Sequence, residues 1–199
     1  MKGVSYVSEQ VASERIRLVA LDLFGRLGID SVSMRQVAAA AGCTVGLVQH
    51  HFGTKDGLRV AVEEEIIEQF EFALSKGPRD RASRDARVQS LLVERPEIVD
   101  YLRRALLDQR GESAGILARL VVMSAGQVSE MRASGHARTD TSAEDQVLRM
   151  LTRQFGVLFL EPMVAGIWAE LDQPETSCPE LKVTLTKSWP SSCDSDLES

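Results

Sequence analysis

The sequence has few aromatic residues, few cysteines and no long apolar run, and each shortage excludes a class of protein. Aromatic residues make up 5% of the 199 residues, and three cysteines, an odd number, do not make a disulfide framework. The longest apolar runs, such as residues 157–160, are far shorter than the roughly 20 residues that span a bilayer. The first ten residues lack the apolar stretch of a secretory signal. We therefore expect a cytoplasmic protein that has no membrane partner.

Signals for β-strands and for catalysis are equally scarce. The chain shows no sustained alternation of apolar and polar residues, and no Asn-Gly or Asp-Gly hairpin lies between β-branched runs. It contains no GxSxG, HExxH or P-loop motif, and no GxGxxG follows a strand. These absences predict an all-α protein that is not an enzyme and that needs no cofactor.

Apolar residues at helical spacing occur along most of the chain. The first predicted helix, at about residues 9–27, ends before Gly28, a residue typical of the position after a helix. Pro162 should kink the last helix or start a new one. Beyond residue 76, the spacing predicts helices at about 80–94, 96–108, 113–133 and 143–171.

The net charge of −6 is unevenly distributed. Residues 1–58 carry a net charge of +1, so the remainder carries −7. The overall charge argues against a nucleic-acid partner, but the difference in sign between the two parts weakens that argument for residues 1–58. The charges behind the +1 are six basic residues (Lys2, Arg15, Arg17, Arg26, Arg35, Lys55) and five acidic ones (Glu9, Glu14, Asp22, Asp30, Asp56).

Residues 33–76 contain three predicted helix starts in close succession. Ser33 and Gln36 form a capping box that starts a short helix, which ends at Gly42. Thr44 caps a second short helix at about 45–51, and Thr54 caps a long helix at about 55–76. Two short helices joined by a tight glycine turn make a helix-turn-helix, whose second helix fits the major groove of DNA.

This region resembles the TetR family of one-component bacterial regulators over about residues 12–62. The resemblance rests on residues 23–24 with Gly28, on 33–38, on 41–44, and on 48–52 with Lys55 and Leu58. It implies a three-helix DNA-binding head at residues 1–54 and a helical body at 55–171 for dimerisation and ligand binding. Residues 172–199, rich in serine and without periodicity, are predicted to be a mostly disordered tail.

The resemblance also implies roles for single residues of the head. Phosphate contacts are expected from the starts of the helices and from His51, and base contacts from Gln49 and its neighbours. Val45, usually polar or basic in the family, and Gln49, usually Tyr, depart from the family pattern, and Leu47 is more apolar than usual. Together these residues suggest contacts with thymine methyl groups. The expected core residues of the head are Val37, Ala38, Val48 and Phe52. The expected DNA-binding residues are Ser33, Arg35, Thr44, Val45, Gly46, Leu47, Gln49, His50, His51 and Lys55.

The resemblance further implies a homodimer built from the helices near 113–133 and 143–171. It implies a repressor that a small-molecule ligand releases from a near-palindromic double-stranded DNA operator, with helix 55–76 as the lever. The residues that could line the ligand pocket could equally form core or dimer interface. They are Met123, Met131, Met150, Phe155, Phe159, Met163 and Trp168, of which Met123, Phe155, Phe159 and Trp168 are the named candidates.

Simpler interpretations stand beside these. His50, His51 and Cys43 could suggest a metal site, but adjacent helical histidines point about 100° apart, so we expect no metal. Glu63-Glu64-Glu65 and Arg103-Arg104 are expected to lie on the solvent surface.

An alternative function is a ligand-binding or protein-interaction module whose head no longer binds DNA, and a further one is an activator or architectural DNA-binding protein.

Overall fold

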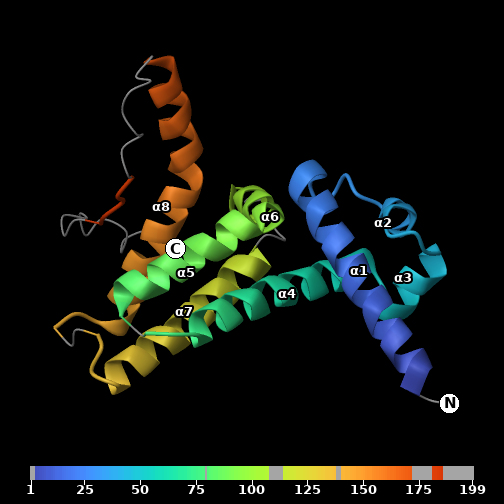
Figure 1. The fold of residues 1–199 in the computed structure, drawn as a ribbon, viewed down its shortest axis with the longest axis horizontal. Coiled ribbons are helices and arrows are strands. Elements are labelled where there is room, and N and C mark those ends of the chain that lie inside the picture. Colours follow the sequence, from blue (N-terminus) through green and yellow to red (C-terminus); the bar gives the residue numbers. More distant parts are fainter. Residues whose placement is uncertain (1–2, 79, 108–113, 138–139, 172–180, 186–199) are drawn as a thin grey trace, which may run out of the picture. The chain divides into compact units, whose positions relative to one another are not determined.

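The computed structural model describes the chain except for residues 1–2, 79, 108–113, 138–139, 172–180 and 186–199. The described residues form eight α-helices and no strand, which confirms the predicted all-α class (Figure 1). Contacts divide the chain into two compact units, residues 1–138 and 139–199. The predicted boundary near residue 54 lies inside the first unit and stays a prediction. No helix among the described residues is long and apolar enough to cross a bilayer.

Three helices form the N-terminal part of the first unit: α1 (Gly3–Leu27), α2 (Met34–Ala40) and α3 (Val45–Phe52). The first helix begins several residues earlier than the spacing predicts, and the two short helices have nearly the predicted bounds. α2 and α3 pack against each other and against α1. Gly28 has a φ of +85°, and its N–H donates to the carbonyl of Phe24, as expected for the residue that ends α1.

The core of this three-helix part is apolar and well buried. Ile16, Ala20 and Phe24 line one side of α1, and Val37, Ala38 and Val48 come from the two short helices. Leu21 of the same helix is also buried, whereas Leu27 at its end is 45% exposed. Phe52 was expected in the core and is only half-buried, because it lies in the last turn of α3.

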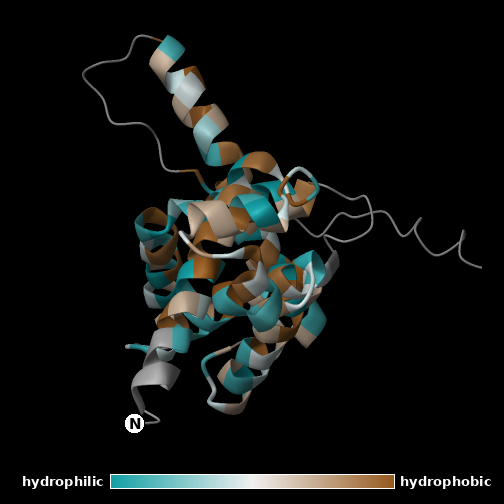
Figure 2. Ribbon diagram, turned by 90° about the vertical axis from the view of Figure 1, so that its right-hand side faces the viewer, coloured by the Kyte–Doolittle hydropathy of each residue, from teal (hydrophilic) through white to brown (hydrophobic). Residues whose placement is uncertain are grey.

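Four further helices complete the first unit: α4 (Lys55–Ser75), α5 (Arg81–Glu94), α6 (Pro96–Leu107) and α7 (Ala114–Ala133). α4 packs against α1 and α3 as well as α5 and α7, so it connects the three-helix part to the rest of the unit (Figure 1). α6 also packs against α1. Hydrophilic and hydrophobic residues occur together on the helices, as in amphipathic helices (Figure 2).

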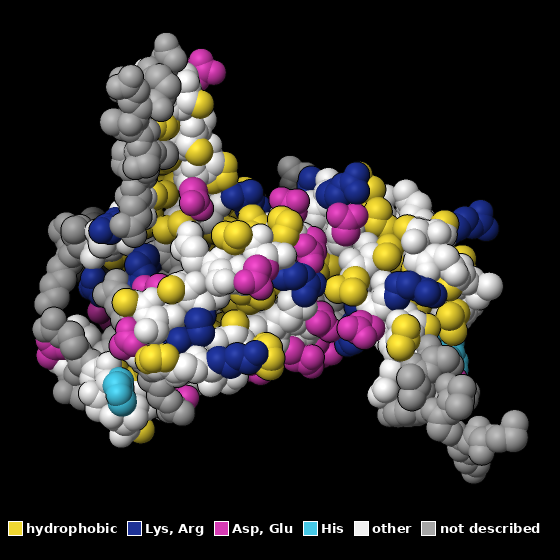
Figure 3. Space-filling view, in the orientation of Figure 1, with side chains coloured by type: hydrophobic (Ala, Val, Ile, Leu, Met, Phe, Trp, Pro, Cys, Tyr) yellow, Lys and Arg dark blue, Asp and Glu magenta, His cyan; other side chains and the backbone are white. Residues whose placement is uncertain are grey.

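The glutamate run on α4 does not lie wholly on the solvent surface, which corrects the sequence-based expectation. Glu63 is 1% exposed, whereas Glu64 is exposed and Glu65 is partly buried beside Arg17. The cause is helical geometry, because Glu63 directly follows buried Val62 and three residues later Ile66 is buried as well. Acidic side chains gather over α4, and the exposed ones include Glu64, Glu68 and Glu71 (Figure 3).

The second unit contains one long helix, α8 (Ala143–Glu170), which continues through Pro162 without a break. Ser142 caps its start by accepting a hydrogen bond from the N–H of Asp145. Residues 181–185 lie against α8: Arg149 donates to the carbonyl of Leu185 at 2.7 Å. The rest of the predicted tail lies outside the described residues.

The buried surface of α4 generates a test of the fold. Leu58 is 0% exposed, so Leu58→Ala should lower the free energy of unfolding by about 2–5 kcal/mol through lost burial and a cavity. Leu107 is 70% exposed, so Leu107→Ala is the matched control and should change stability by less than about 0.5 kcal/mol. Urea denaturation of both variants measures the difference, and equal stabilities would contradict the described packing.

Candidate nucleic-acid interface

The start of α2 is held by the predicted capping box. The Ser33 hydroxyl accepts a hydrogen bond from the N–H of Gln36 at 3.3 Å, and the Gln36 side-chain oxygen accepts one from the N–H of Ser33 at 2.8 Å. Two backbone N–H groups that the helix leaves unpaired are thereby satisfied. Arg35, in the same turn, is exposed. The sequence predicted this end of the site correctly at the level of single hydrogen bonds.

The turn between α2 and α3 has the hydrogen bonds of a Schellman motif. The N–H of Cys43 donates to the carbonyl of Ala38 at 2.9 Å, and the N–H of Gly42 donates to that of Ala39 at 3.2 Å. Gly42 has a φ of +63°, a conformation that favours glycine. Backbone hydrogen bonds close this turn, so α3 begins only a few residues after the end of α2. The direction of α3 relative to α2 is therefore well defined.

α3 presents one polar face to solvent. The Thr44 hydroxyl caps it by accepting from the N–H of Leu47 at 3.2 Å. Gly46, Gln49 and His50 are exposed, whereas Val48 is fully buried. Val45 and Leu47, the two apolar residues that differ from the family pattern, are half-buried at the edges of the exposed face. The exposed face of α3 therefore combines a glycine, an amide and an imidazole.

The turn between α3 and α4 depends on a glycine that the sequence analysis did not single out. The Thr54 hydroxyl accepts from the N–H of Gly57 at 3.0 Å, which confirms the third predicted cap. A Cβ added at Gly57 would overlap the carbonyl oxygen of Phe52, so residue 57 must be glycine for this turn to close. A glycine inside a predicted helix is an available signal, but the close approach that requires it is visible only in three dimensions.

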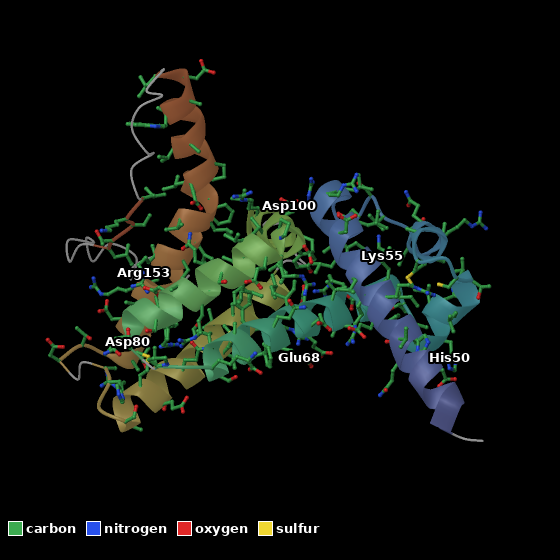
Figure 4. All side chains as sticks on the ribbon, in the orientation of Figure 1. His50, Lys55, Glu68, Asp80, Asp100 and Arg153 are labelled. Atoms are coloured by element: carbon green, nitrogen blue, oxygen red, sulfur yellow. The ribbon has the colours of Figure 1, made fainter. Side chains whose placement is uncertain are left out.

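Lys55 and His51 have surroundings that the sequence did not reveal. Lys55 donates through Nζ to the carbonyl of Ile29 at 3.1 Å, so the first residue of α4 holds the loop after α1 (Figure 4). An ammonium group has three donors, which leaves capacity for the expected phosphate contact. His51 Nε2 is buried and has no hydrogen-bond partner, so the expected phosphate contact requires its ring to turn. His50, by contrast, is exposed on α3.

The remaining site predictions concern metal and ligand binding. Among the described residues, no group of three or more histidine, cysteine or acidic side chains is placed to hold a metal ion. The ligand-pocket candidates are distributed over both units: Met123 lies on α7, and Phe155, Phe159 and Trp168 lie on α8. All four are half-buried, so the choice between pocket, core and interface stays open.

Comparison with known proteins finds a family model and a curated relative that match the region of the helix-turn-helix. Residues 16–62 match the model of the bacterial regulatory proteins of the tetR family. The HTH-type transcriptional regulatory protein RaaS of Mycobacterium tuberculosis is 34% identical over 120 residues, which cover 57% of this chain. The matched region spans about half (51%) of the length of that relative.

Solved structures agree on the fold. GusR of Salmonella enterica superposes with a TM-score of 0.60 at 19% identity, over 74% of this chain and 82% of that one. The fatty acid degradation regulator FadR of Bacillus halodurans superposes with a TM-score of 0.58 at 15% identity, over 82% and 87% of the two chains. At these identities the likeness concerns the arrangement of helices, which includes a helix-turn-helix head and a helical body.

Two glycines of this interface give a matched test. Gly57→Ala should lower the free energy of unfolding by about 1–3 kcal/mol, because the new Cβ forces the α3–α4 turn to shift. Gly46→Ala should be neutral or stabilise by up to about 1 kcal/mol, since the nearest atom to its Cβ is the Thr44 hydroxyl at 3.9 Å. Thermal and urea denaturation compare the variants. Equal losses of stability would show that the close approach at Gly57 is not as described.

Proposed function

Because residues 16–62 match the model of the tetR family of bacterial regulatory proteins, we propose that the protein regulates transcription by binding double-stranded DNA at a specific sequence. The observation that carries this proposal is the exposed face of α3, where Gly46, Gln49 and His50 point to solvent from a helix capped and buried on its other side. A single helix of this size fits the major groove and can reach base edges.

The three capped helix starts supply the contacts with the DNA backbone. The N-termini of α2, α3 and α4 carry unpaired N–H groups and the positive end of the helix dipole, which attract phosphate. Ser33, Thr44 and Thr54 organise these ends, and exposed Arg35 adds a positive charge beside the first of them. Exposed acidic residues such as Glu68 lie farther along α4, so the duplex is best accommodated on the side of the short helices.

We further propose that the protein acts as a homodimer. Leu160, Met163, Ile167 and Leu171 are spaced along one stripe of α8 and are each 38–58% exposed, an unusual amount of apolar side chain to leave in water (Figure 3). A second copy would bury these residues and place two heads on one DNA. Heads about 34–36 Å apart reach successive major grooves, so the operator should be a near-palindrome.

Repression follows from occupancy of a promoter, and release requires a ligand that prefers another state of the dimer. A small molecule bound in the body releases DNA only if it favours the state whose heads are wrongly spaced. α4 runs from the helix-turn-helix into the body and is suited to transmit the change. A coupling of about 1–3 kcal/mol between the ligand and DNA sites would change operator affinity about 5- to 150-fold.

Selection of bound DNA from a random pool tests DNA recognition. The wild type should enrich a near-palindrome, Gln49→Ala should lose preference at one base position per half-site, and Gln89→Ala, an exposed glutamine on α5, should select the same sequence as the wild type. Arg35→Ala should weaken all sequences alike and reduce the salt slope by about one. We prefer Arg35 to Lys55 for this test because Lys55 also holds the loop after α1. No enrichment at low salt would leave a ligand-binding or protein-interaction module as the better proposal.

The dimer proposal has its own test. Ile167→Glu should yield monomers in light scattering with unchanged helical content, because a buried unpaired carboxylate opposes association. Affinity for the full operator should fall by about 100-fold as the two heads become independent. Val93→Glu places the same charge at a 76% exposed position of α5 and should leave the dimer intact. A dimer that persists in Ile167→Glu would move the interface away from this stripe.

A further inference from the structure

One buried carboxylate joins three helices of the first unit. Glu63 on α4 accepts a hydrogen bond at Oε1 from the Tyr101 hydroxyl of α6 at 2.9 Å. The same oxygen accepts from Arg59 Nη1 at 2.8 Å, and Arg119 Nε of α7 lies 3.7 Å from Oε2. We call these four residues, Arg59, Glu63, Tyr101 and Arg119, the Glu63 junction. A buried carboxylate without such partners would be strongly unfavourable, so the partners hold α4, α6 and α7 together.

The junction is tightly packed. A Cβ added at Gly115, near the start of α7, would lie 2.9 Å from Glu63 Oε2 and 3.0 Å from Arg59 Nη1, so α7 closely approaches these α4 side chains at this glycine. Burial and the neighbouring Glu63 carboxylate raise the pKa of Tyr101, which keeps its hydroxyl protonated and donating. A displacement at the start of α7 therefore changes the surroundings of the Glu63 carboxylate, which accepts the hydrogen bond from Tyr101.

α6 carries this connection to the end of α1. Arg104, one turn beyond Tyr101, donates through Nε to the carbonyl of Gly25 at 3.0 Å and through Nη2 to that of Arg26 at 2.9 Å. These carbonyls belong to the last turn of α1, where a helix leaves acceptors unpaired and favours a cation. The helices also touch directly, since a Cβ added at Gly25 would lie 3.0 Å from the backbone nitrogen of Tyr101. Asp100 of α6 borders the same contact (Figure 4).

We propose that Tyr101 and Arg104 are positioning residues that set the orientation of the DNA-binding helices through α6. The Glu63 junction fixes α6 relative to α4 and α7, and Arg104 ties α6 to the C-terminal end of α1. α1 in turn packs against α2 and α3, so the orientation of α3 depends on α6 as well as on α4. This inference rests on the proposed DNA binding, and it assigns a function to the contacts of buried Tyr101 and of Arg104, which the sequence did not reveal.

Discrimination between operator spacings tests the proposal, because a ratio of affinities is independent of the fraction of protein that is folded. The probes are the selected palindrome and duplexes with one base pair added or removed between its half-sites. Arg104→Met should reduce the wild-type preference for the correct spacing by roughly fivefold or more. Arg87→Met is the matched control: it removes a similar bond, from Arg87 Nη2 to the carbonyl of Pro78 at 2.9 Å, within the body, and should keep the preference.

Tyr101→Phe supplies the second variant, since it removes one hydroxyl and keeps the ring. It should also reduce the spacing preference, and the double variant Tyr101→Phe/Arg104→Met should lose less than the two single losses combined, because both act through α6. The proposal would be overturned if both single variants kept the wild-type preference for the correct spacing. It would also be overturned if the loss of preference in the double variant equalled the sum of the two single losses. A wild type that selects no sequence or accepts all spacings would instead overturn the proposed dimeric DNA binding, and with it any role for α6 in that binding.

Discussion

The position of α3 depends on the hydrogen bonds at its start and on its packing against neighbouring helices more than on the helix itself. A helix of eight residues is marginal in water, because the cost of nucleating it is spread over few bonds. Here the Schellman turn at Gly42 and the Thr44 cap define its start, and buried Val48 attaches it to α1 and α4. The proposed DNA-binding face is therefore exposed on an element whose direction is set by its neighbours, and a change in those neighbours reaches the face directly.

In the body, a buried charge sets the positions of the helices relative to one another. Glu63 is removed from water, and its desolvation is offset by hydrogen bonds from Arg59 and Tyr101 and by the charge of Arg119. Apolar contacts between helices tolerate small sliding movements, whereas a carboxylate with directional partners has few acceptable arrangements. An interaction of this type is well suited to a protein that must distinguish two positions of its helices.

The sequence allowed the helix-turn-helix to be predicted well, because capping and helical periodicity are local properties. The hydroxyls of Ser33, Thr44 and Thr54 make the expected bonds, and the bounds of α2 and α3 agree within a residue or two. Glu63 was misplaced because a run of glutamates usually faces solvent, and two of its three partners, Tyr101 and Arg119, are 38 and 56 residues away. Gly57 went unnoticed for a related reason, since its constraint comes from the carbonyl of Phe52 across a turn. Long-range packing leaves no periodic signal in a single sequence.

The contact between α8 and residues 181–185 has a practical consequence for handling the protein. A Cβ added at Gly156 would lie 2.6 Å from Val183 Cγ1, so this part of α8 is shaped to receive the segment that follows it. Arg149 uses the carbonyl of Leu185 as an acceptor. A chain shortened after α8 would uncover α8 at Gly156 and remove that acceptor. Purified fragments that end near residue 171 would thus have a different α8 surface from that of the 199-residue chain.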